Sequence, residues 1–253
     1  NNCKLYLAPM QGLTDAPMRD LLTRIGGFDE CVSEFVRITH TVHSRATWLK
    51  YAPEMAQGNQ TVSGVPCTVQ LLGSDAENMA INALEAVRMG AAKIDINFGC
   101  PAPTVNKHLG GAILLREPER VHQIVDTVRR HLPEHIPLSA KMRLGFEDKS
   151  LALDNAAAIA AGGACALTVH ARTKVEGYEP PAHWIWVRKI RDSVSIPVIA
   201  NGDVFCLDDY LGIKNESGCE HVMLGRGAVM RPDLARQIKA YEAGEHVPDM
   251  LFS

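Results

Sequence analysis

Residues 94–101 read IDINFGCP, a strand-like alternation that runs directly into Gly99, Cys100 and Pro101. Glycine supplies unusual backbone angles and proline cannot continue a central ladder, so the strand is expected to stop here. The Cys100 thiol is then left at the mouth of the strand, where it could act as an acid, a nucleophile or a metal ligand. A lone cysteine is more often simply buried, so a functional role for Cys100 depends on which residues lie near it in the folded chain.

Seven further segments share this apolar or β-branched character, and most are separated by helix-like stretches. The eight predicted strands are 5–9, 31–36, 66–72, 93–98, 137–143, 165–170, 196–200 and 220–224. The predicted helices are 15–25, with Thr14 as its N-cap, then a short one near 43–51, and 76–89, 117–131, 151–161, 183–193, 207–214 and 232–243.

Alternation of strands and helices implies right-handed βαβ units and a parallel sheet. Eight such strands in 253 residues predict an α/β fold of the (β/α)8 TIM-barrel type. A doubly wound sheet is the alternative, but no G-x-G-x-x-G follows the first strand. We therefore expect one barrel with no internal domain boundary.

Composition limits the class of protein and its partners. No apolar run approaches the roughly 20 residues of a membrane-spanning helix, so no membrane contact is expected. Seven scattered cysteines form no C-x-x-C pair and no cluster with zinc spacing, which predicts reduced thiols, a cytoplasmic location and no metal. The net charge of −3 shows no general electrostatic footprint for nucleic acid.

The active site of a TIM barrel lies at the carboxyl ends of its strands. Nearly every predicted strand of this chain delivers a polar side chain or a glycine to that face, which would be unusual for a structural accident. In chain order these residues are Pro9, Met10, Gln11, Arg37, Gln70, Asn97, Cys100, Lys141, Arg143, His170, Arg172, Asn201, Gly202, Asp203, Gly225 and Arg226.

Several of these side chains are unusual in a strand. Gln70 lies inside an apolar segment, where a buried amide needs several hydrogen-bond partners. Lysine is rarely buried unless it is paired, so Lys141 predicts an anionic partner. Lys141 and Arg143 alternate with Met142, which leaves open that one of the two basic residues faces the helices. A single His170 would more often be structural than catalytic.

The ends of the last two predicted strands indicate a phosphate site. Asn201-Gly202 and Gly225-Arg226-Gly227 occupy the positions where such barrels often bind phosphate. Glycine lets backbone N–H groups approach an anion, a following helix N-terminus adds its dipole, and arginine can bind two phosphate oxygens. The pattern predicts a phosphate-binding site but does not say which phosphate compound binds.

Together these motifs resemble the tRNA-dihydrouridine synthases over essentially the whole chain. The motifs that carry the resemblance are APMQGLTD at 8–15, NFGCP at 97–101, GGA at 110–112, KMRLG at 141–145, VHART at 169–173 and NGD at 201–203. EFVR at 34–37 and VQLLG at 69–73 are most similar to the tRNA-dihydrouridine(16) synthase branch, which acts on U16.

The resemblance implies the domain organisation and the reaction. Residues 1–243 would form an FMN-binding catalytic barrel, and 244–253 would begin a linker to a C-terminal helical tRNA-binding domain outside this chain. The implied reaction is the reduction of a uridine in tRNA to 5,6-dihydrouridine, with NADPH as reductant. The implied partner is tRNA, and we expect the enzyme to be a monomer.

The resemblance also implies roles for the residues at the strand ends. Pro9, Met10 and Gln11 would line the flavin, Gln70 would hydrogen-bond its ring, and Lys141 would lie by its electron-rich edge. The ribityl phosphate would be held by Asn201, Gly202, Asp203, Gly225 and Arg226, with His170 nearby. Arg37 and Asn97 would contact the target nucleotide, and Arg143 and Arg172 its surroundings. Cys100 would be the general acid.

Three other functions are compatible with the same residues. An FMN barrel could act on a free pyrimidine, as a dihydroorotate-type dehydrogenase does, and assays with free pyrimidine and with tRNA would separate the two. The chain could be a flavoprotein that serves mainly to bind tRNA, although binding alone needs neither Cys100 nor Lys141. A flavin-free aldolase-type barrel could use Lys141 for a Schiff base, and flavin absorption bands would exclude it.

Overall fold

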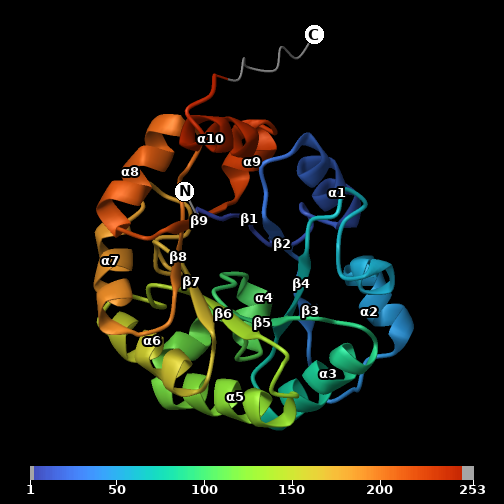
Figure 1. Ribbon diagram of the computed structural model, residues 1–253. Coiled ribbons are helices and arrows are strands. Elements are labelled where there is room, and N and C mark those ends of the chain that lie inside the picture. Colours follow the sequence, from blue (N-terminus) through green and yellow to red (C-terminus); the bar gives the residue numbers. More distant parts are fainter. Residues whose placement is uncertain (1–2, 247–253) are drawn as a thin grey trace.

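The computed structural model describes residues 3–246, and its parallel sheet closes into a barrel (Figure 1). The strands are β1 (Leu5–Leu7), β2 (Glu30–Val32), β3 (Val36–Arg37), β4 (Cys67–Leu72), β5 (Ile94–Phe98), β6 (Leu138–Arg143), β7 (Ala166–His170), β8 (Val198–Asn201) and β9 (His221–Leu224). Their order is β2-β1-β9-β8-β7-β6-β5-β4-β3, and β2 also pairs with β4. Because β2 and β3 both pair with β4, they are two parts of one barrel strand. The predicted eight-stranded TIM barrel is confirmed.

The predicted second strand, 31–36, is interrupted at residues 33–35, which the sequence pattern did not indicate. The Phe35 backbone N–H donates 3.0 Å to the Gln11 side chain, and the Glu34 carboxylate accepts a 2.5 Å bond from the Gly12 N–H. This segment therefore bonds to the loop that follows β1. Those contacts replace strand pairing at this point and hold two loops together at the carboxyl end of the barrel.

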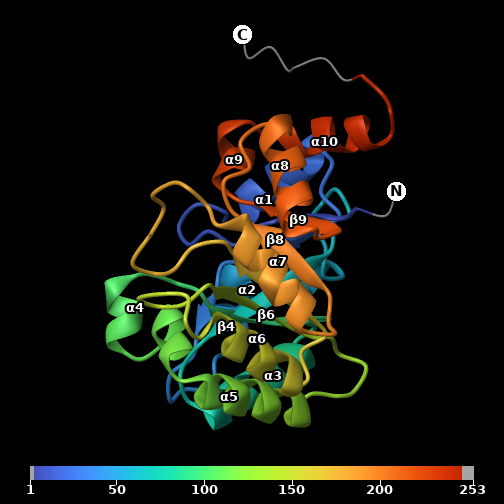
Figure 2. The same cartoon turned by 90° about the vertical axis from the view of Figure 1, so that its left-hand side faces the viewer.

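Helices surround the sheet (Figure 1). They are α1 (Ala16–Ile25), α2 (Arg45–Tyr51), α3 (Ala76–Arg88), α4 (Pro103–Lys107), α5 (Pro118–His131), α6 (Ala152–Ala161), α7 (Trp184–Ser193), α8 (Leu207–Ser217), α9 (Arg226–Met230) and α10 (Leu234–Glu242), with 3-10 turns at Pro53–Gln57 and Gly111–Arg116. Helix α4 and the connection after β7 project from one end of the barrel, opposite the N-terminus (Figure 2). Helices α4 and α9 and both 3-10 turns were not among the predicted elements. Of the predicted linker 244–253, residues 247–253 lie outside the described residues.

Two apolar clusters lie on the two sides of the sheet. Leu5 and Leu7 belong to the large cluster between the sheet and the helices, whereas Tyr6 and Ala8 belong to a small one with Val32, Ile199 and Met223. Successive strand residues point to opposite faces, so the small cluster fills the inside of the barrel beside β1, β8 and β9. The inside beside β4, β5 and β6 is polar instead, because Gln70, Asp95 and Ser139 are buried there.

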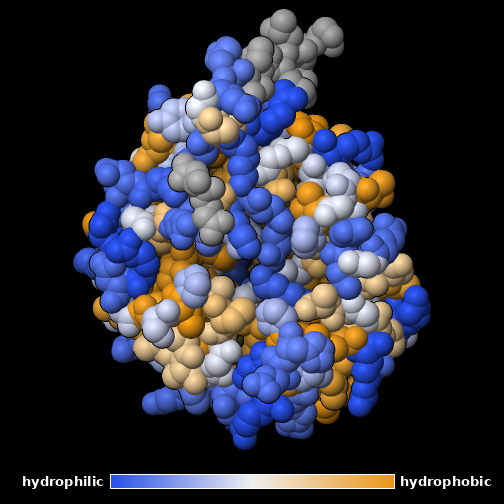
Figure 3. All heavy atoms as spheres, viewed as in Figure 1, coloured by the Kyte–Doolittle hydropathy of each residue, from blue (hydrophilic) through white to orange (hydrophobic). Residues whose placement is uncertain are grey.

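Figure 3 shows the end of the barrel opposite α4, where polar residues alternate with separate apolar areas. Within residues 3–246, no helix has the length and apolar character needed to cross a membrane. Cys3, Cys31, Cys67, Cys100, Cys165, Cys206 and Cys219 are all free thiols. Among the described residues no group of three or more His, Cys, Asp or Glu side chains could hold a metal ion.

The N-cap of α1 is Asp15 rather than the predicted Thr14. The Asp15 carboxylate accepts a 3.0 Å bond from the Met18 N–H. Thr14 is buried, and its hydroxyl accepts a 2.8 Å bond from the Met10 N–H while its carbonyl accepts from the guanidinium of Arg19. Thr14 therefore shapes the loop that presents Met10 and leaves the capping of the helix to the next residue.

The Asp15→Ala variant is expected to lower the free energy of unfolding by about 1 kcal/mol, because an N-terminal N–H of α1 loses its acceptor. Urea denaturation followed by circular dichroism measures the difference. Asp15→Ser keeps a capping oxygen and is the matched control. Equal destabilisation by the serine and alanine variants would contradict the capping role.

Candidate active site

A cleft of about 540 Å³ opens at the carboxyl ends of the strands, and a smaller pocket of about 90 Å³ adjoins it. The cleft is within the size range of small-molecule sites. Both hollows are lined by Met10, Lys141, His170, Tyr178 and Arg226, so they are parts of one site. All the candidate residues from the sequence line one or both of them, with two exceptions, Arg37 and Arg172.

The two exceptions lie elsewhere. Arg37 is exposed and lines a separate pocket of about 170 Å³ together with His40 and His108. Arg172 has 0 % exposure, forms an ion pair with Asp203 and donates 2.7 Å to the carbonyl of Glu179. Arg172 therefore does not line the cleft in this structure, and its contact with the surroundings of the nucleotide stays a prediction. Its position just after β7 suggested the cleft, but its side chain turns under the loop and holds Asp203.

The register of the strands explains how the side chains of the cleft come together. Asn97 on β5 is aligned with Lys141 on β6, and Arg143 on β6 with His170 on β7. His170 is in turn aligned with Asn201 on β8. Lys141 and Arg143 are two residues apart and point to the same side of the sheet, so the alternative in which one faces the helices is excluded. Both line the cleft.

The turn that carries Cys100 is held by two asparagine side chains. The Asn97 Oδ1 accepts from the N–H of Gly99 at 2.9 Å and from that of Cys100 at 2.8 Å. The Asn106 amide donates 3.0 Å to the carbonyl of Cys100. The thiol is half-buried, and its burial raises the pKa of Cys100, opposed in part by the charges of Arg143 and Lys141. The thiol is therefore protonated near neutral pH and can donate a proton.

Lys141 is a cation without a counter-ion in the cleft. Its burial, reinforced by the charge of Arg143, lowers the pKa of Lys141 from 10.5 to about 8. Within residues 3–246 its ammonium group makes no ion pair, and the largest contribution that favours its charged form comes from Asp95. An uncompensated ammonium that remains largely charged at pH 7 is suited to bind an anionic group.

His170 is neutral. Burial, together with the charges of Arg143, Lys141, Arg172 and Arg226, holds the pKa of His170 well below 6.5. A neutral imidazole can donate one hydrogen bond and accept another. His170 therefore adds a hydrogen-bonding group, and no charge, to a site that already holds several cations.

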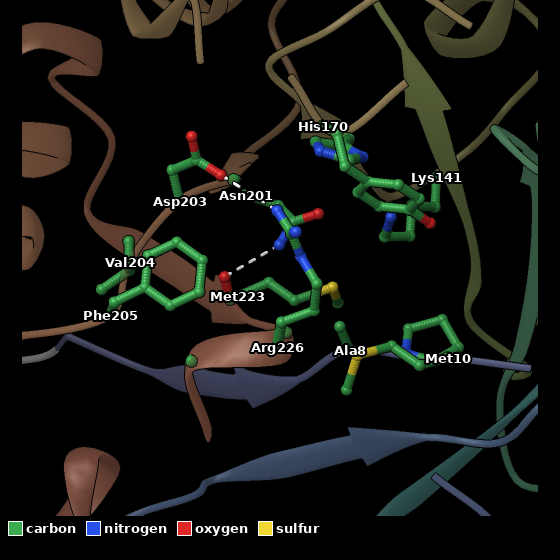
Figure 4. Close-up of a pocket in the computed structure, with 15 residues that line it drawn as sticks. Ala8, Met10, Lys141, His170, Asn201, Asp203, Val204, Phe205, Met223 and Arg226 are labelled. Carbon is green, nitrogen blue, oxygen red and sulfur yellow. Dashed lines mark hydrogen bonds and ion pairs between the residues drawn. The ribbon is translucent and has the colours of Figure 1, made fainter. Parts of the chain in front are cut away.

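Arg226 is the most prominent cation of the smaller pocket. Figure 4 shows it with Phe205 on one side and Lys141 and His170 on the other. Its guanidinium carbon lies 4.6 Å from the ring centre of Tyr178 and 5.5 Å from that of Phe205, and one of its nitrogens is 3.2 Å from Asp203. Because Arg172 already neutralises Asp203, the shared carboxylate orients Arg226 and leaves the pocket with net positive charge.

The glycines of this pocket leave room for a ligand. A Cβ at Gly225 would lie 3.7 Å from the sulfur of Met10 and 3.8 Å from the Cβ of Ala8, so a side chain there would extend among the lining residues. Gly202 has a φ of 129°, a backbone conformation that L side chains rarely adopt. An arginine beside two glycine turns is an arrangement suited to a phosphate.

Tyr178, Phe205 and Asp95 are three functional side chains in or beneath the site that were not among the sequence candidates. Tyr178 and Phe205 lie in loops after β7 and β8, and no periodic pattern marks a loop residue as part of a cleft. Tyr178 stacks on Arg143 at 5.1 Å and on Arg226 at 4.6 Å. Asp95 lies beneath the cleft, hydrogen-bonded to Gln70. The alternation of IDINF, which places Asp95 on the same face as Asn97, could have identified it.

Comparison with known proteins identifies relatives of the whole chain. A family model described as dihydrouridine synthase matches residues 6–252. A tRNA-dihydrouridine(16) synthase of Neisseria meningitidis serogroup A is 76 % identical over 250 residues, which are 99 % of this chain and 75 % of the relative. A tRNA-dihydrouridine(16) synthase of Aquipseudomonas alcaligenes is 56 % identical over 247 residues, 98 % of this chain and 78 % of that protein.

Solved structures with the same fold are more distant in sequence. A histamine dehydrogenase from Rhizobium sp. 4-9 superposes with a TM-score of 0.69 at 13 % identity, over 95 % of this chain and 46 % of that chain. A morphinone reductase variant in complex with tetrahydroNAD superposes with a TM-score of 0.63 at 14 % identity, over 97 % of this chain and 88 % of that chain. These likenesses support the barrel fold alone. The family follows from the sequence matches: this chain belongs to the dihydrouridine synthase family.

Proposed function

We propose that this chain reduces U16 of tRNA to 5,6-dihydrouridine, with FMN as its flavin and NADPH as the reductant of the flavin. Two relatives that match 99 % and 98 % of this chain are named tRNA-dihydrouridine(16) synthases, which supports the substrate and the position. The observation that carries the proposal is the meeting of a protonated thiol and a cationic pocket in one cleft. The same proposal makes the enzyme a cytoplasmic monomer with residues 1–243 as its catalytic barrel.

The residues of the cleft fit a flavin mononucleotide. Gly202, Gly225 and Arg226 would hold its phosphate, because two glycines without side chains and an oriented guanidinium line the same pocket. Asn201 is held by a 3.0 Å bond from its amide to the Met223 carbonyl. Asp203 would act by orienting Arg226 rather than by touching an anion.

The ring system would lie in the larger part of the cleft, lined by Pro9, Met10, Gln11 and Gln70. Lys141 would be the cation beside it, which favours a flavin that carries negative charge. No dinucleotide-binding fingerprint occurs in the sequence, so we expect NADPH to bind transiently.

The reaction requires a hydride at C6 and a proton at C5 of the uracil ring. When bound, the flavin supplies the hydride, because no side chain can. Cys100 holds the proton on its Sγ atom and delivers it to C5, and Asn97 keeps the thiol in place through the backbone of the turn. The uridine must leave its stack to enter the cleft, at a cost of a few kcal/mol. Arg143, bound to three carbonyl groups, forms part of the wall that excludes water.

The proposed function is tested with the full-length enzyme, unmodified tRNA and NADPH. Purified protein should show flavin absorption bands, and nucleoside mass spectrometry should find dihydrouridine in the tRNA fragment that contains position 16. Reduction of free uracil or oxidation of dihydroorotate without any action on tRNA would instead support a free-pyrimidine enzyme. Absence of flavin bands from protein purified in the presence of FMN would contradict the proposal.

Because the pKa of Lys141 is lowered to about 8, we expect the affinity for FMN to fall as pH rises through this value. Above that pH the ammonium group loses its proton and its attraction for an anion, and we expect about a tenfold loss. Fluorescence titration between pH 6 and 9 measures the affinity. Lys141→Arg, which does not titrate in this range, should remove the pH dependence, and an unchanged dependence in that variant would contradict the assignment.

Whereas the affinity for FMN should fall as pH rises, the contribution of Lys141 to the free energy of unfolding should rise. The unfolded chain keeps this proton up to about 10.5 and the folded chain only up to about 8. Between these values the unfolded state binds more protons, so the contribution of Lys141 to the free energy of unfolding increases with pH.

A further inference from the structure

A buried carboxylate lies beneath the cleft, and the proposed reaction assigns it no role. Asp95 on β5 is 5 % exposed and points into the barrel between β4 and β6. Its Oδ1 accepts a 2.6 Å bond from the hydroxyl of Ser139, and its Oδ2 accepts a 2.8 Å bond from the Nε2 of Gln70. The pKa of Asp95 is raised above its usual value because the carboxyl is buried, and these two hydrogen bonds offset only part of the rise.

A chain of hydrogen bonds connects this carboxylate to the turn of Cys100. The Gln70 Oε1 accepts a 3.0 Å bond from the Asn97 Nδ2. The Asn97 Oδ1 then accepts from the backbone N–H groups of Gly99 at 2.9 Å and of Cys100 at 2.8 Å. The chain thus runs from the interior of the barrel to the backbone of the thiol that faces the cleft.

The direction of this chain follows from hydrogen-bonding chemistry. Asp95 accepts a hydrogen bond from the NH₂ group of Gln70, which leaves the Gln70 oxygen to accept from Asn97. Asn97 must then turn its own NH₂ group to Gln70, which leaves its oxygen for the two N–H groups of the turn. A reversed amide at either position would place two donors or two acceptors against each other.

The barrel does not need these polar groups in order to close. On its other side, the inside of the same barrel is filled by apolar side chains, among them Tyr6, Ile199 and Met223. Burying a carboxylate and two amides costs free energy that their mutual hydrogen bonds must offset. A polar chain of this kind beside β4 and β5 is therefore better explained by the site above it than by packing.

We propose that Asp95 is a positioning residue that orients the Gln70 and Asn97 amides and thereby holds the Cys100 thiol in place. Its effect on catalysis rests on the proposed function of Cys100, whereas its effect on the turn does not. Loss of the carboxylate frees the Gln70 amide to rotate, and the turn at 97–100 then loses its side-chain anchor. A displaced reacting group can lower a rate about 100-fold.

Asp95→Ala, Asp95→Asn and Ser139→Ala in the full-length holoenzyme separate positioning from a need for charge. Asp95→Ala removes the acceptor, and we expect kcat for tRNA reduction to fall about 10–100-fold with little change in KM. Asp95→Asn keeps an oxygen for Gln70 and can donate to the Ser139 hydroxyl, so its kcat should stay within about threefold of wild type. Ser139→Ala leaves the bond between Asp95 and Gln70 intact and should behave like the asparagine variant.

Hydrogen exchange gives a readout that needs neither flavin nor tRNA. In Asp95→Ala, the peptide containing the Gly99 and Cys100 amides should exchange at least about tenfold faster than in wild type, while peptides from β8 and α6 should be unchanged. The asparagine variant should restore slow exchange. Combining Asp95→Ala with Gln70→Ala should raise the exchange rate little beyond that of either single variant, because both break the same chain.

Specific outcomes would overturn the inference. Wild-type exchange at Gly99 and Cys100 in Asp95→Ala would do so, as would an asparagine variant as impaired as the alanine variant, or additive effects of the Asp95 and Gln70 substitutions on the exchange rate. These outcomes differ from failure of the proposed function, in which the wild-type enzyme does not reduce tRNA at all, whatever the exchange data show.

Discussion

The Cys100→Ala variant of the full-length enzyme is expected to retain its flavin and to form dihydrouridine about 10²–10⁴ times more slowly than wild type. The thiol lies in the same cleft as Lys141 and Gln70, and burial raises its pKa, so it holds a proton near neutral pH. No other side chain with a proton to give is presented by the same turn. Removal of Cys100 therefore removes the proton donor while the cationic pocket is left intact.

Single-turnover reduction of tRNA by the pre-reduced enzyme, followed by nucleoside mass spectrometry, measures this effect. Cys206→Ala is the matched control, because Cys206 is also half-buried but lies away from the cleft, at the start of α8. The wild-type rate should fall as pH rises through the pKa of Cys100, since only the protonated thiol can donate. Normal turnover by Cys100→Ala would exclude the proton-donor role.

The Arg226→Ala variant should bind FMN about 100-fold more weakly than wild type, the size expected for the loss of a charged hydrogen bond. Its guanidinium is held between two aromatic rings and beside Asp203, which itself pairs with buried Arg172. Such a side chain is already oriented before a phosphate arrives. Its loss should weaken phosphate binding with little effect on binding of the ring.

Fluorescence titration with FMN and with riboflavin, which lacks the phosphate, separates these two contributions. The affinity for riboflavin should be the same in wild type and in Arg226→Ala. Arg130→Ala, at an exposed position on α5 paired with Asp126, is the control for loss of a surface arginine. An unchanged FMN affinity in Arg226→Ala, or an equal loss for riboflavin, would contradict the phosphate assignment.

Most of the barrel could be predicted because its signals are local. Alternating strands, intervening helices and strand ends marked by glycine or polar residues identified seven of the eight barrel strands as continuous segments. The interruption of the second strand could not be predicted, because it depends on bonds from Gly12 and Phe35 to side chains more than 20 residues away. Asp15 rather than Thr14 caps α1 for a similar reason, because Thr14 accepts hydrogen bonds from the Met10 N–H and the Arg19 guanidinium instead.

The candidate site was predicted where a residue's position along a strand decides where its side chain points. Asn97, Lys141 and His170 follow from strand register and line the cleft. Arg172 does not, because it lies two residues beyond the end of β7, where the chain turns and buries its guanidinium against Asp203. Tyr178 reaches the cleft from a loop, whose path depends on contacts that no periodic pattern encodes.

By itself the sequence determined the barrel, the turn that presents Cys100 and membership of the dihydrouridine synthase family, because alternation, turn residues and motifs are properties of neighbouring positions. Only the tertiary structure decided how that thiol is supported. Gln70, Asp95 and Asn97 come from two strands, and their amide orientations are set by a buried carboxylate aligned across the sheet. Hydrogen bonds between strands depend on register and closure of the barrel, which are established only when the whole chain folds.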